Sequence, residues 1–217
     1  NSASLRFLPA TSHIPRALGR NILKTIPKTF FIAFGDLGGV KFNYFWYNEY
    51  MKTKPYYKYS DFSLYHGNSL DILAEIQENS VDMIFADPPY LLSNGGFTCH
   101  AGQMVSVNKG QWDVSNGLKK DFEFHLSWIE ACKRVLKPGG TIWISGTYHS
   151  IYQCGFALQV AKFHILNDIA WLKPNASPNL SCRFFTASHE TLIWARKDQK
   201  SKHKFNYKVM KEGNWPE

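Results

Sequence analysis

Hydrophobic residues recur from residue 63 onward at the spacings of alternating strands and helices. A short apolar strand is predicted over residues 63–66, and the apolar run at 81–86 predicts a buried strand. Between them, an apolar stripe at helical spacing, capped by Asn68 or Ser69, predicts a helix. A polar stretch with several glycines follows at 91–117, and we expect it to be a long loop that closes over a ligand.

The second half of the chain continues the alternation. Apolar residues at helical spacing predict a helix from about residue 120, and the sequence Lys-Pro-Gly-Gly at 137–140 is a strong signal for its end. The remaining elements are a strand over 141–145, a helix over 151–162 and strands over 165–172 and 190–196. Strands that alternate with helices predict an α/β domain with a doubly wound, mostly parallel sheet.

The first 50 residues lack this regularity. Three prolines interrupt any helix, and the aromatic stretch at 42–47 has no clear period. The regular pattern opens at Met51. We therefore interpret residues 1–50 as an atypical N-terminal extension, from upstream read-through and dispensable for the rest, and residues 51–217 as the main domain.

Composition and charge indicate which class of partner the chain could bind. With 217 residues, 44% of them hydrophobic, the chain is long enough for one domain with a sizeable core. The net charge of +8 resides at the two ends, since residues 1–50 and 196–217 each carry +4 and the middle is neutral. This balance suits nucleic acid, although a solvated surface segment explains a basic run equally well. The candidates for phosphate contacts are Lys197, Lys200, Lys202 and Lys204.

The cysteine and histidine spacings do not predict a metal site. The four cysteines form no C-x-x-C pair, so we expect no zinc or disulfide framework and a reducing, cytoplasmic location. The apolar run near the N-terminus, residues 30–34, is too short to cross a membrane, so no membrane partner is expected.

Asp87-Pro88-Pro89-Tyr90 carries the chemistry that the sequence predicts. The motif directly follows the predicted strand at 81–86, and ligands of open α/β sheets bind at such carboxyl ends. The prolines stiffen the turn and leave carbonyl acceptors, while the carboxylate accepts a hydrogen bond from an exocyclic amino group. The tyrosine offers a ring on which an extruded base can stack. An Asp-Pro turn without function is the alternative.

The motif and its surroundings resemble the β-class DNA adenine-N6 methyltransferases. Residues 79–90, the Trp-Leu-Lys-Pro-Asn stretch at 171–175 and the strand at 190–195 are similar to that class. The sequences at 92–96 and 178–183 are most similar to the single-strand-active GATC methyltransferases of DpnII-type restriction-modification systems. The resemblance covers residues 51–217. It implies a Rossmann-like fold and transfer of a methyl group from S-adenosylmethionine to adenine N6, with base flipping, in GATC sites of single- or double-stranded DNA.

The resemblance also assigns roles to residues. Asp87 would accept from the adenine amino group, Tyr90 would stack on the base, and Pro88 and Pro89 would shape the turn. The residues implied at the cofactor are Asp87, Asn68, Ser145 and Gly146. The candidates for contacts with DNA phosphates or base edges are Asn175, Asn179 and Arg183, for which an ordinary turn is an equal alternative. A homodimer is a further expectation.

The chain departs from the family pattern at the cofactor. It does not contain the D-P-F-x-G-x-G segment that follows the target-recognition region in relatives, and Gly67-Asn68 stands where they often have Gly-Asp. We therefore interpret residues 51–217 as the catalytic part and the start of the target-recognition region of an incomplete methyltransferase fold. Two alternatives stay open: an inactive nucleic-acid-binding remnant, and an amino-methyltransferase that acts on cytosine N4 or on RNA.

Overall fold

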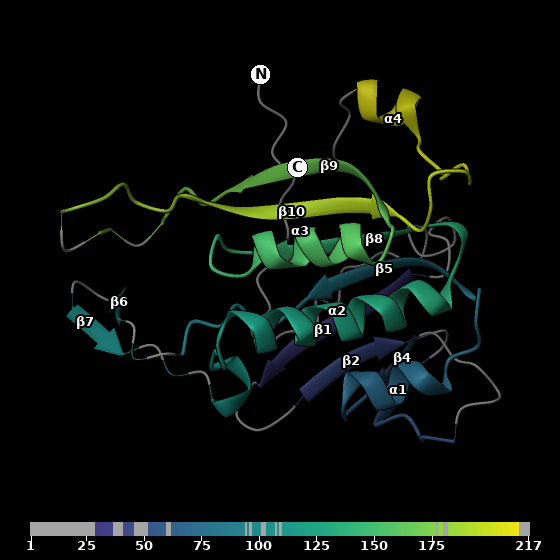
Figure 1. Cartoon of the computed structure of the whole chain (residues 1–217), viewed down its shortest axis with the longest axis horizontal. Coiled ribbons are helices and arrows are strands. Elements are labelled where there is room, and N and C mark those ends of the chain that lie inside the picture. The colour runs from purple at the N-terminus through teal and green to yellow at the C-terminus, as the bar shows by residue number, and fades with distance from the viewer. Residues whose placement is uncertain are drawn as a thin grey trace.

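A computed structural model shows a mixed sheet with helices packed against it (Figure 1). The structure describes residues 29–36, 41–45, 52–59, 62–93, 95, 97–100, 103–106, 108, 110–176, 178–179 and 182–212. The main sheet has eight strands in the order β3-β4-β2-β1-β5-β8-β10-β9. They are β1 (Thr29–Asp36), β2 (Lys41–Phe45), β3 (Tyr57–Tyr59), β4 (Phe62–Tyr65), β5 (Val81–Asp87), β8 (Leu136–Gly146), β9 (His164–Leu172) and β10 (His189–Arg196).

The helices agree with the apolar spacing in the sequence. They are α1 (Ser69–Glu75), α2 (Leu118–Val135), α3 (Ile151–Val160) and the short α4 (Tyr207–Glu212), with a 3₁₀ turn η1 (Gln111–Asp113) before α2. Asn68 caps α1 as predicted, because its Oδ1 accepts a hydrogen bond from the Leu70 amide at 2.9 Å. The core lies between α1, α2 and α3 and the strands β5 and β8, where Trp128, Ile129 and Ile144 are fully buried.

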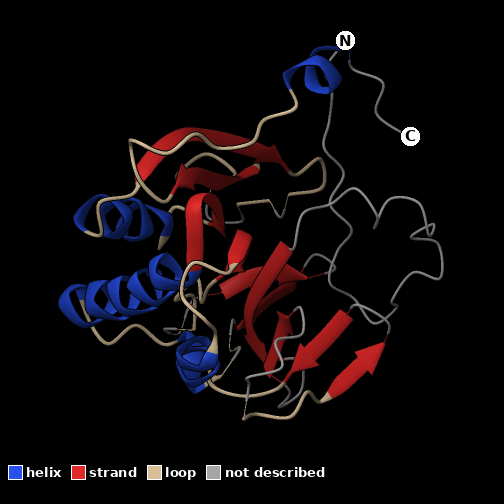
Figure 2. Cartoon of the chain, turned by 90° about the vertical axis from the view of Figure 1, so that its right-hand side faces the viewer, coloured by secondary structure: helices blue, strands red, loops and turns tan. Residues whose placement is uncertain are grey.

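The prediction of an α/β fold is confirmed, but that of a doubly wound, mostly parallel sheet is not. Among the described strands, only β1–β5 and β5–β8 are parallel pairs, and β10 is antiparallel to both β8 and β9. In Figure 2, α1, α2 and α3 lie along one side of the sheet. The crossovers from β4 to β5, β5 to β8 and β8 to β9 all step in the same direction across the sheet. Right-handed crossovers then place their helices on the same face.

One local prediction is confirmed and another needs correction. Helix α2 ends at Val135, directly before the Lys-Pro-Gly-Gly sequence, but β8 already includes this sequence and so begins five residues earlier than predicted, beside a register shift between Val81 and Met83 on β5. The expected long loop over 91–117 contains a hairpin of β6 (Phe97–His100) and β7 (Gln103–Ser106) and then η1. Each of these two strands has only four residues, so its apolar positions do not stand out from the polar, glycine-containing stretch around it.

The segment interpreted as an N-terminal extension contributes strands to the main sheet. Within residues 1–50 the structure describes only β1 and β2. Strand β1 lies between β2 and β5 and pairs with β5 in parallel, with Ala33 opposite Asp87. The strand that ends at the Asp-Pro-Pro-Tyr motif therefore has neighbours on both sides.

Candidate active site

Asp87 is the last residue of β5, at the carboxyl edge of the parallel strands β1, β5 and β8. The face of β5 that carries Ile84 and Ala86 is fully buried, and Met83 and Phe85 on the other face are half-buried, which fixes this strand in the sheet. The following Pro88 and Pro89 are also buried, so the turn that leads to Tyr90 is held by packing as well as by the proline rings. The structure thus places the whole motif where the sequence predicts it.

Two hydroxyl groups orient the Asp87 carboxylate. Tyr90 Oη donates to Asp87 Oδ1 at 2.8 Å, and Ser145 Oγ donates to the same oxygen at 2.6 Å. Ser145 is 2% exposed, near the end of the neighbouring strand β8. Among the described residues no hydrogen bond reaches Oδ2. The carboxylate is therefore fixed through one oxygen, and the other is available to accept from a ligand amino group.

The Tyr90 hydroxyl lies between two carboxylates. Glu190 lies near the start of β10, and its Oε2 is 3.5 Å from Tyr90 Oη. The other oxygen of the Glu190 carboxylate, Oε1, forms an ion pair with Lys173 Nζ at 3.0 Å. Lys173 in turn lies 3.6 Å from the ring centre of Trp171. Burial raises the pKa of Tyr90 far above its ordinary value, and the charges of Asp87 and Glu190 raise it further. Tyr90 stays protonated at neutral pH and acts as a hydrogen-bond donor.

Asp113 is a functional candidate that the sequence analysis missed. Its carboxylate is fully buried in η1 and accepts hydrogen bonds from the amides of Leu91 and Leu92, the two residues that follow Tyr90. The sequence separation of 22 residues between Asp113 and Leu91 hides this contact from any local pattern. The available signal was an acidic residue between apolar Trp112 and Val114, which indicates burial.

The predicted cofactor residues divide into two groups. Asp87 and Ser145 lie together, and Asn68 follows β4, whose carboxyl end is at the same edge because β4 runs parallel to β1. Their carboxylate, hydroxyl and amide groups fit the amino and hydroxyl groups of a nucleoside cofactor. Packing, rather than contact with a cofactor, explains the glycine at position 146. A Cβ there would lie 3.2 Å from Ile151 Cδ1 at the start of α3.

The predicted DNA-contacting asparagines and arginine lie in the connection between β9 and β10. This connection projects from the same end of the sheet as the β6–β7 hairpin, the end at which β5 and β9 finish (Figure 1). Arg183 is exposed, and Asn175 is exposed in a turn. Asn179 Nδ2 donates to the Phe184 carbonyl at 2.6 Å, so this side chain shapes the connection itself.

The basic run lies at the opposite edge of the sheet. Strand β10 is antiparallel to β8, so its last residue, Arg196, pairs with Thr141 in the middle of β8, which lies opposite Met83, four residues before Asp87 on β5. Lys197 is occupied there: its Nζ donates to the Leu136 carbonyl at 2.6 Å and to Asn79 Oδ1 at 2.7 Å. The structure therefore does not bring Lys197, Lys200, Lys202 and Lys204 together with Asp87.

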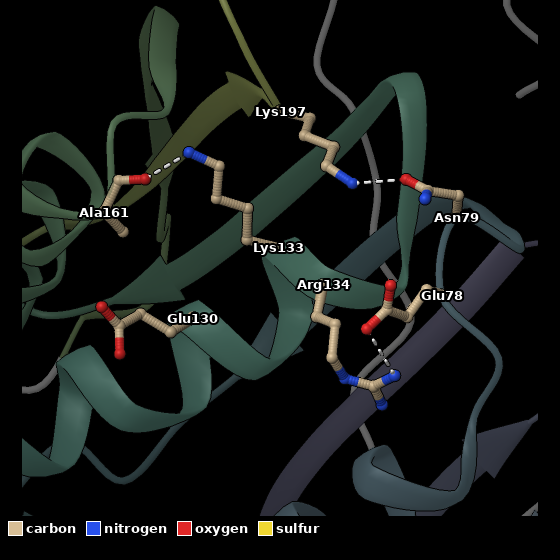
Figure 3. A pocket seen from close by; sticks show the side chains of 7 residues that line it. All are labelled: Glu78, Asn79, Glu130, Lys133, Arg134, Ala161 and Lys197. Carbon is tan, nitrogen blue, oxygen red and sulfur yellow. Dashed lines mark hydrogen bonds and ion pairs between the residues drawn. The ribbon is translucent and has the colours of Figure 1, made fainter.

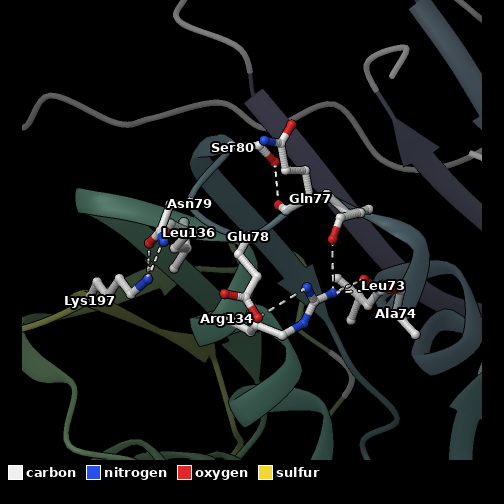
Figure 4. Close-up of polar contacts among 10 residues, drawn as sticks. Leu73, Ala74, Gln77, Glu78, Asn79, Ser80, Arg134, Leu136 and Lys197 are labelled. Carbon is white, nitrogen blue, oxygen red and sulfur yellow. Dashed lines mark hydrogen bonds and ion pairs between the residues drawn. The ribbon is translucent and has the colours of Figure 1, made fainter. Parts of the chain in front are cut away.

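A pocket of about 350 Å³ opens at this opposite edge (Figure 3). Its lining residues are Glu78, Asn79, Glu130, Lys133, Arg134, Ala161 and Lys197. The cations are bound to carbonyl groups at helix ends: Lys133 Nζ donates to the Ala161 and Lys162 carbonyls after α3. Arg134 Nη2 likewise donates to the Leu73 and Ile76 carbonyls at the end of α1 (Figure 4). We attribute these side chains to fold stability rather than to catalysis.

Searches for other classes of site gave two observations. Across the described ranges, no three His, Cys, Asp or Glu side chains gather in a way that would hold a metal ion. Within the same residues, no helix has the length and apolar character needed to cross a membrane.

Comparison with known proteins identifies the family. A family model described as DNA methylase, for N6 and N4 methyltransferases, matches residues 81–215. The type II methyltransferase M2.LlaDCHI of Lactococcus lactis subsp. cremoris is 51% identical over 173 residues, which cover 79% of this chain and 64% of that protein. The type II methyltransferase M2.DpnII of Streptococcus pneumoniae is 50% identical over 176 residues, 81% of this chain and 66% of that protein. The chain thus spans slightly less than two thirds of these relatives.

A solved structure supports the fold. The PvuII DNA methyltransferase, described as cytosine-N4-specific, superposes with a TM-score of 0.56 at 19% identity, covering 74% of this chain and 57% of that one. At this identity the likeness concerns the fold, and it agrees with the sheet that carries Asp87 at its carboxyl edge. The matched family model includes the Asp-Pro-Pro-Tyr motif and the strands β5, β8, β9 and β10 around it. The chain belongs to the DNA methylase family of N6 and N4 methyltransferases.

Proposed function

We propose that the protein transfers a methyl group from S-adenosylmethionine to adenine N6 in DNA, at GATC sites and within a restriction-modification system. The observation that carries the proposal is the Asp87 carboxylate, held through Oδ1 by Tyr90 and Ser145 beside a turn of two buried prolines. A carboxylate held through Oδ1 at the carboxyl edge of the sheet presents Oδ2 to an exocyclic amino group. The names and the roughly half-identical sequences of the type II relatives support DNA as the substrate.

The side chains of this site act mainly through orientation. Asp87 accepts a hydrogen bond from the adenine amino group and so directs the nitrogen lone pair, while the Tyr90 ring stacks on the extruded base. When bound, S-adenosylmethionine supplies an electrophilic methyl group; Asp87, Ser145 and Asn68 are the residues present to hold it. The amino nitrogen would take the methyl group as the sulfur–methyl bond breaks, with that bond's electron pair left on sulfur, and it would lose one proton, which the neighbouring Asp87 carboxylate would accept and pass to solvent.

Labelled S-adenosylmethionine tests the proposal, with single- and double-stranded GATC oligonucleotides and matched oligonucleotides that lack the site. We expect label in N6-methyladenine and loss of that label in Asp87→Ala, with DNA binding largely retained. Asp82→Ala is the matched control: Asp82 lies on the same strand but pairs with Lys137 at 2.9 Å, near the opposite end of β5. This control should methylate like the wild type.

Other outcomes would favour the alternatives. Label in cytosine or RNA would change the acceptor, and DNA binding without measurable affinity for S-adenosylmethionine would favour a binding protein. Because the chain spans under two thirds of its relatives, the same assay should include the chain completed with the part of M2.DpnII that it does not match. Absence of label in both forms would refute the proposed activity. A homodimer and a cytoplasmic location accompany the proposal as expectations, and light scattering in the presence and absence of DNA tests the former.

A further inference from the structure

We propose that Asp113 is a positioning residue that holds the turn after Tyr90 and thereby sets the geometry of the Asp-Pro-Pro-Tyr motif. The functional part of this inference rests on the proposed methyltransferase activity, since the turn matters for transfer only if Asp87 and Tyr90 bind the base. The contact itself is independent of that activity. No residue of η1 belongs to the motif, and the link between the two segments exists only in the fold.

The Asp113 carboxylate gathers three donors from the segment that leaves the motif. Its Oδ1 accepts from the Leu91 amide at 2.8 Å, and its Oδ2 accepts from the Leu92 amide at 3.1 Å and from Ser93 Oγ at 2.8 Å. The Asp113 carbonyl also accepts from the Ser93 amide at 3.2 Å. A fully buried carboxylate needs hydrogen-bond donors in place of the water it has lost, and the 91–93 segment supplies them, so the two segments stabilise each other.

Backbone strain lies at the residue that Asp113 holds. Leu91 has a φ of +59°, a left-handed conformation that L-residues other than glycine and asparagine adopt at an energetic cost. Such strain persists where surrounding contacts determine it, and it concentrates at functional sites. Because Leu91 directly follows Tyr90, its φ sets the direction in which the chain leaves the ring. The Asp113 contacts therefore help to keep Tyr90 Oη within reach of Asp87.

The same contacts close the base of the segment that carries the β6–β7 hairpin. This segment leaves the core at Ser93 and returns at Asp113, and the two residues are joined by both side-chain and backbone hydrogen bonds. In Figure 1 the hairpin projects from the end of the sheet at which β5 finishes. One buried side chain thus anchors both the catalytic turn and the two ends of the projecting segment.

Hydrogen exchange tests the contact in the full chain. In Asp113→Asn, the hydrogen exchange of the backbone N–H groups of residues 91–93 should accelerate roughly tenfold or more. The asparagine side chain has one acceptor oxygen instead of two, so it cannot accept all three hydrogen bonds. The matched control is Asp121→Asn, since Asp121 is also a buried carboxylate, 4% exposed, but accepts from Ser115 and Asn116 before α2. Unchanged exchange at 91–93 in Asp113→Asn, or equal acceleration in the control, would overturn the proposal.

A rescue experiment separates positioning from general stability. We expect kcat for methyl transfer to fall roughly tenfold in Asp113→Asn, with KM for DNA and affinity for S-adenosylmethionine within about twofold of wild type. Glycine adopts the Leu91 conformation without strain, so Leu91→Gly in the Asp113→Asn background should recover most of kcat. A purely structural role predicts no recovery, and that result would refute positioning.

Two further outcomes remain decisive. If Asp113→Asn does not fold, Ser93→Ala removes one donor and keeps both amide contacts; it should accelerate exchange at 91–93 by a few-fold, and no acceleration would refute the role of the cluster. If the wild-type chain transfers no methyl group, the proposed function fails, while the exchange data still decide whether Asp113 holds the turn.

Discussion

Arg134 offers a quantitative test of how the ends of the helices are held. It lies in the last turn of α2, and its Nη2 donates to the Leu73 carbonyl at 2.6 Å and to the Ile76 carbonyl at 2.9 Å (Figure 4). These groups are at the C-terminal end of α1, where carbonyls have no partner within the helix. The same guanidinium is 3.9 Å from Glu78, an exposed carboxylate.

The magnitudes decide which of these interactions matters. Hydrogen bonds to charged groups contribute about 1.5–3 kcal/mol each, and partial exposure of Arg134 reduces the sum, so Arg134→Met should cost about 2–3 kcal/mol of unfolding free energy. The long, exposed pair with Glu78 should contribute less than about 0.5 kcal/mol. For a domain of this size, the first change lowers Tm by about 5–10 °C and Glu78→Gln lowers it by about 1 °C.

Equilibrium urea unfolding followed by circular dichroism measures both changes. The control is Lys119→Met on the same helix, whose side chain is 88% exposed and pairs with Glu123 at 3.9 Å. It should leave the midpoint within error of wild type. If Arg134→Met unfolds within about 0.5 kcal/mol of wild type, or if Glu78→Gln costs as much, the assignment of this side chain to the end of α1 is wrong.

Two further predictions concern a buried histidine and the support of Asp87. Burial lowers the pKa of His125 to about 4 in the folded state, against an ordinary value of 6.5, so below pH 6.5 only the unfolded chain takes up this proton. The unfolding free energy should fall by up to about 3 kcal/mol between pH 6.5 and 4, and His125→Gln should flatten that slope in pH-dependent urea titrations. Ser145→Ala removes the 2.6 Å bond to Asp87 and should slow single-turnover methyl transfer roughly tenfold with DNA binding within twofold; an unchanged rate would contradict a supporting role.

The sequence predicted those parts of the structure that depend on local patterns. The apolar run at 81–86 followed by two prolines placed β5 and its motif correctly, because a short apolar run and the conformational limits of proline leave few alternatives. The apolar spacing likewise located α2 and α3 to within a few residues. What the sequence could not supply was the partner of each polar group. Asp113 lies 20–22 residues from its donors, and no periodicity connects them.

The direction of β10 shows why strand direction matters for the site. A strand pattern gives no orientation, and a simple alternation of strands and helices predicts a parallel one. In the fold β10 is antiparallel to β8, so its first residues lie at the carboxyl edge and its last residues at the opposite edge. This single reversal brings Glu190 within 3.5 Å of the Tyr90 hydroxyl and carries Lys197 away to the end of α2.

The same reversal changes which charges can influence the reaction. The basic run after β10 was a sequence-based candidate for phosphate contacts, but Lys197 donates its hydrogen bonds to the carbonyl at the end of α2 and to Asn79. At the edge that carries Asp87, Lys173 directly follows β9, and its ammonium pairs with Glu190 and lies over the ring of Trp171. Lys173 also begins the connection that contains Asn175 and Arg183. The β9–β10 connection and the motif are therefore joined by charge as well as by position, through Lys173, Glu190 and Tyr90.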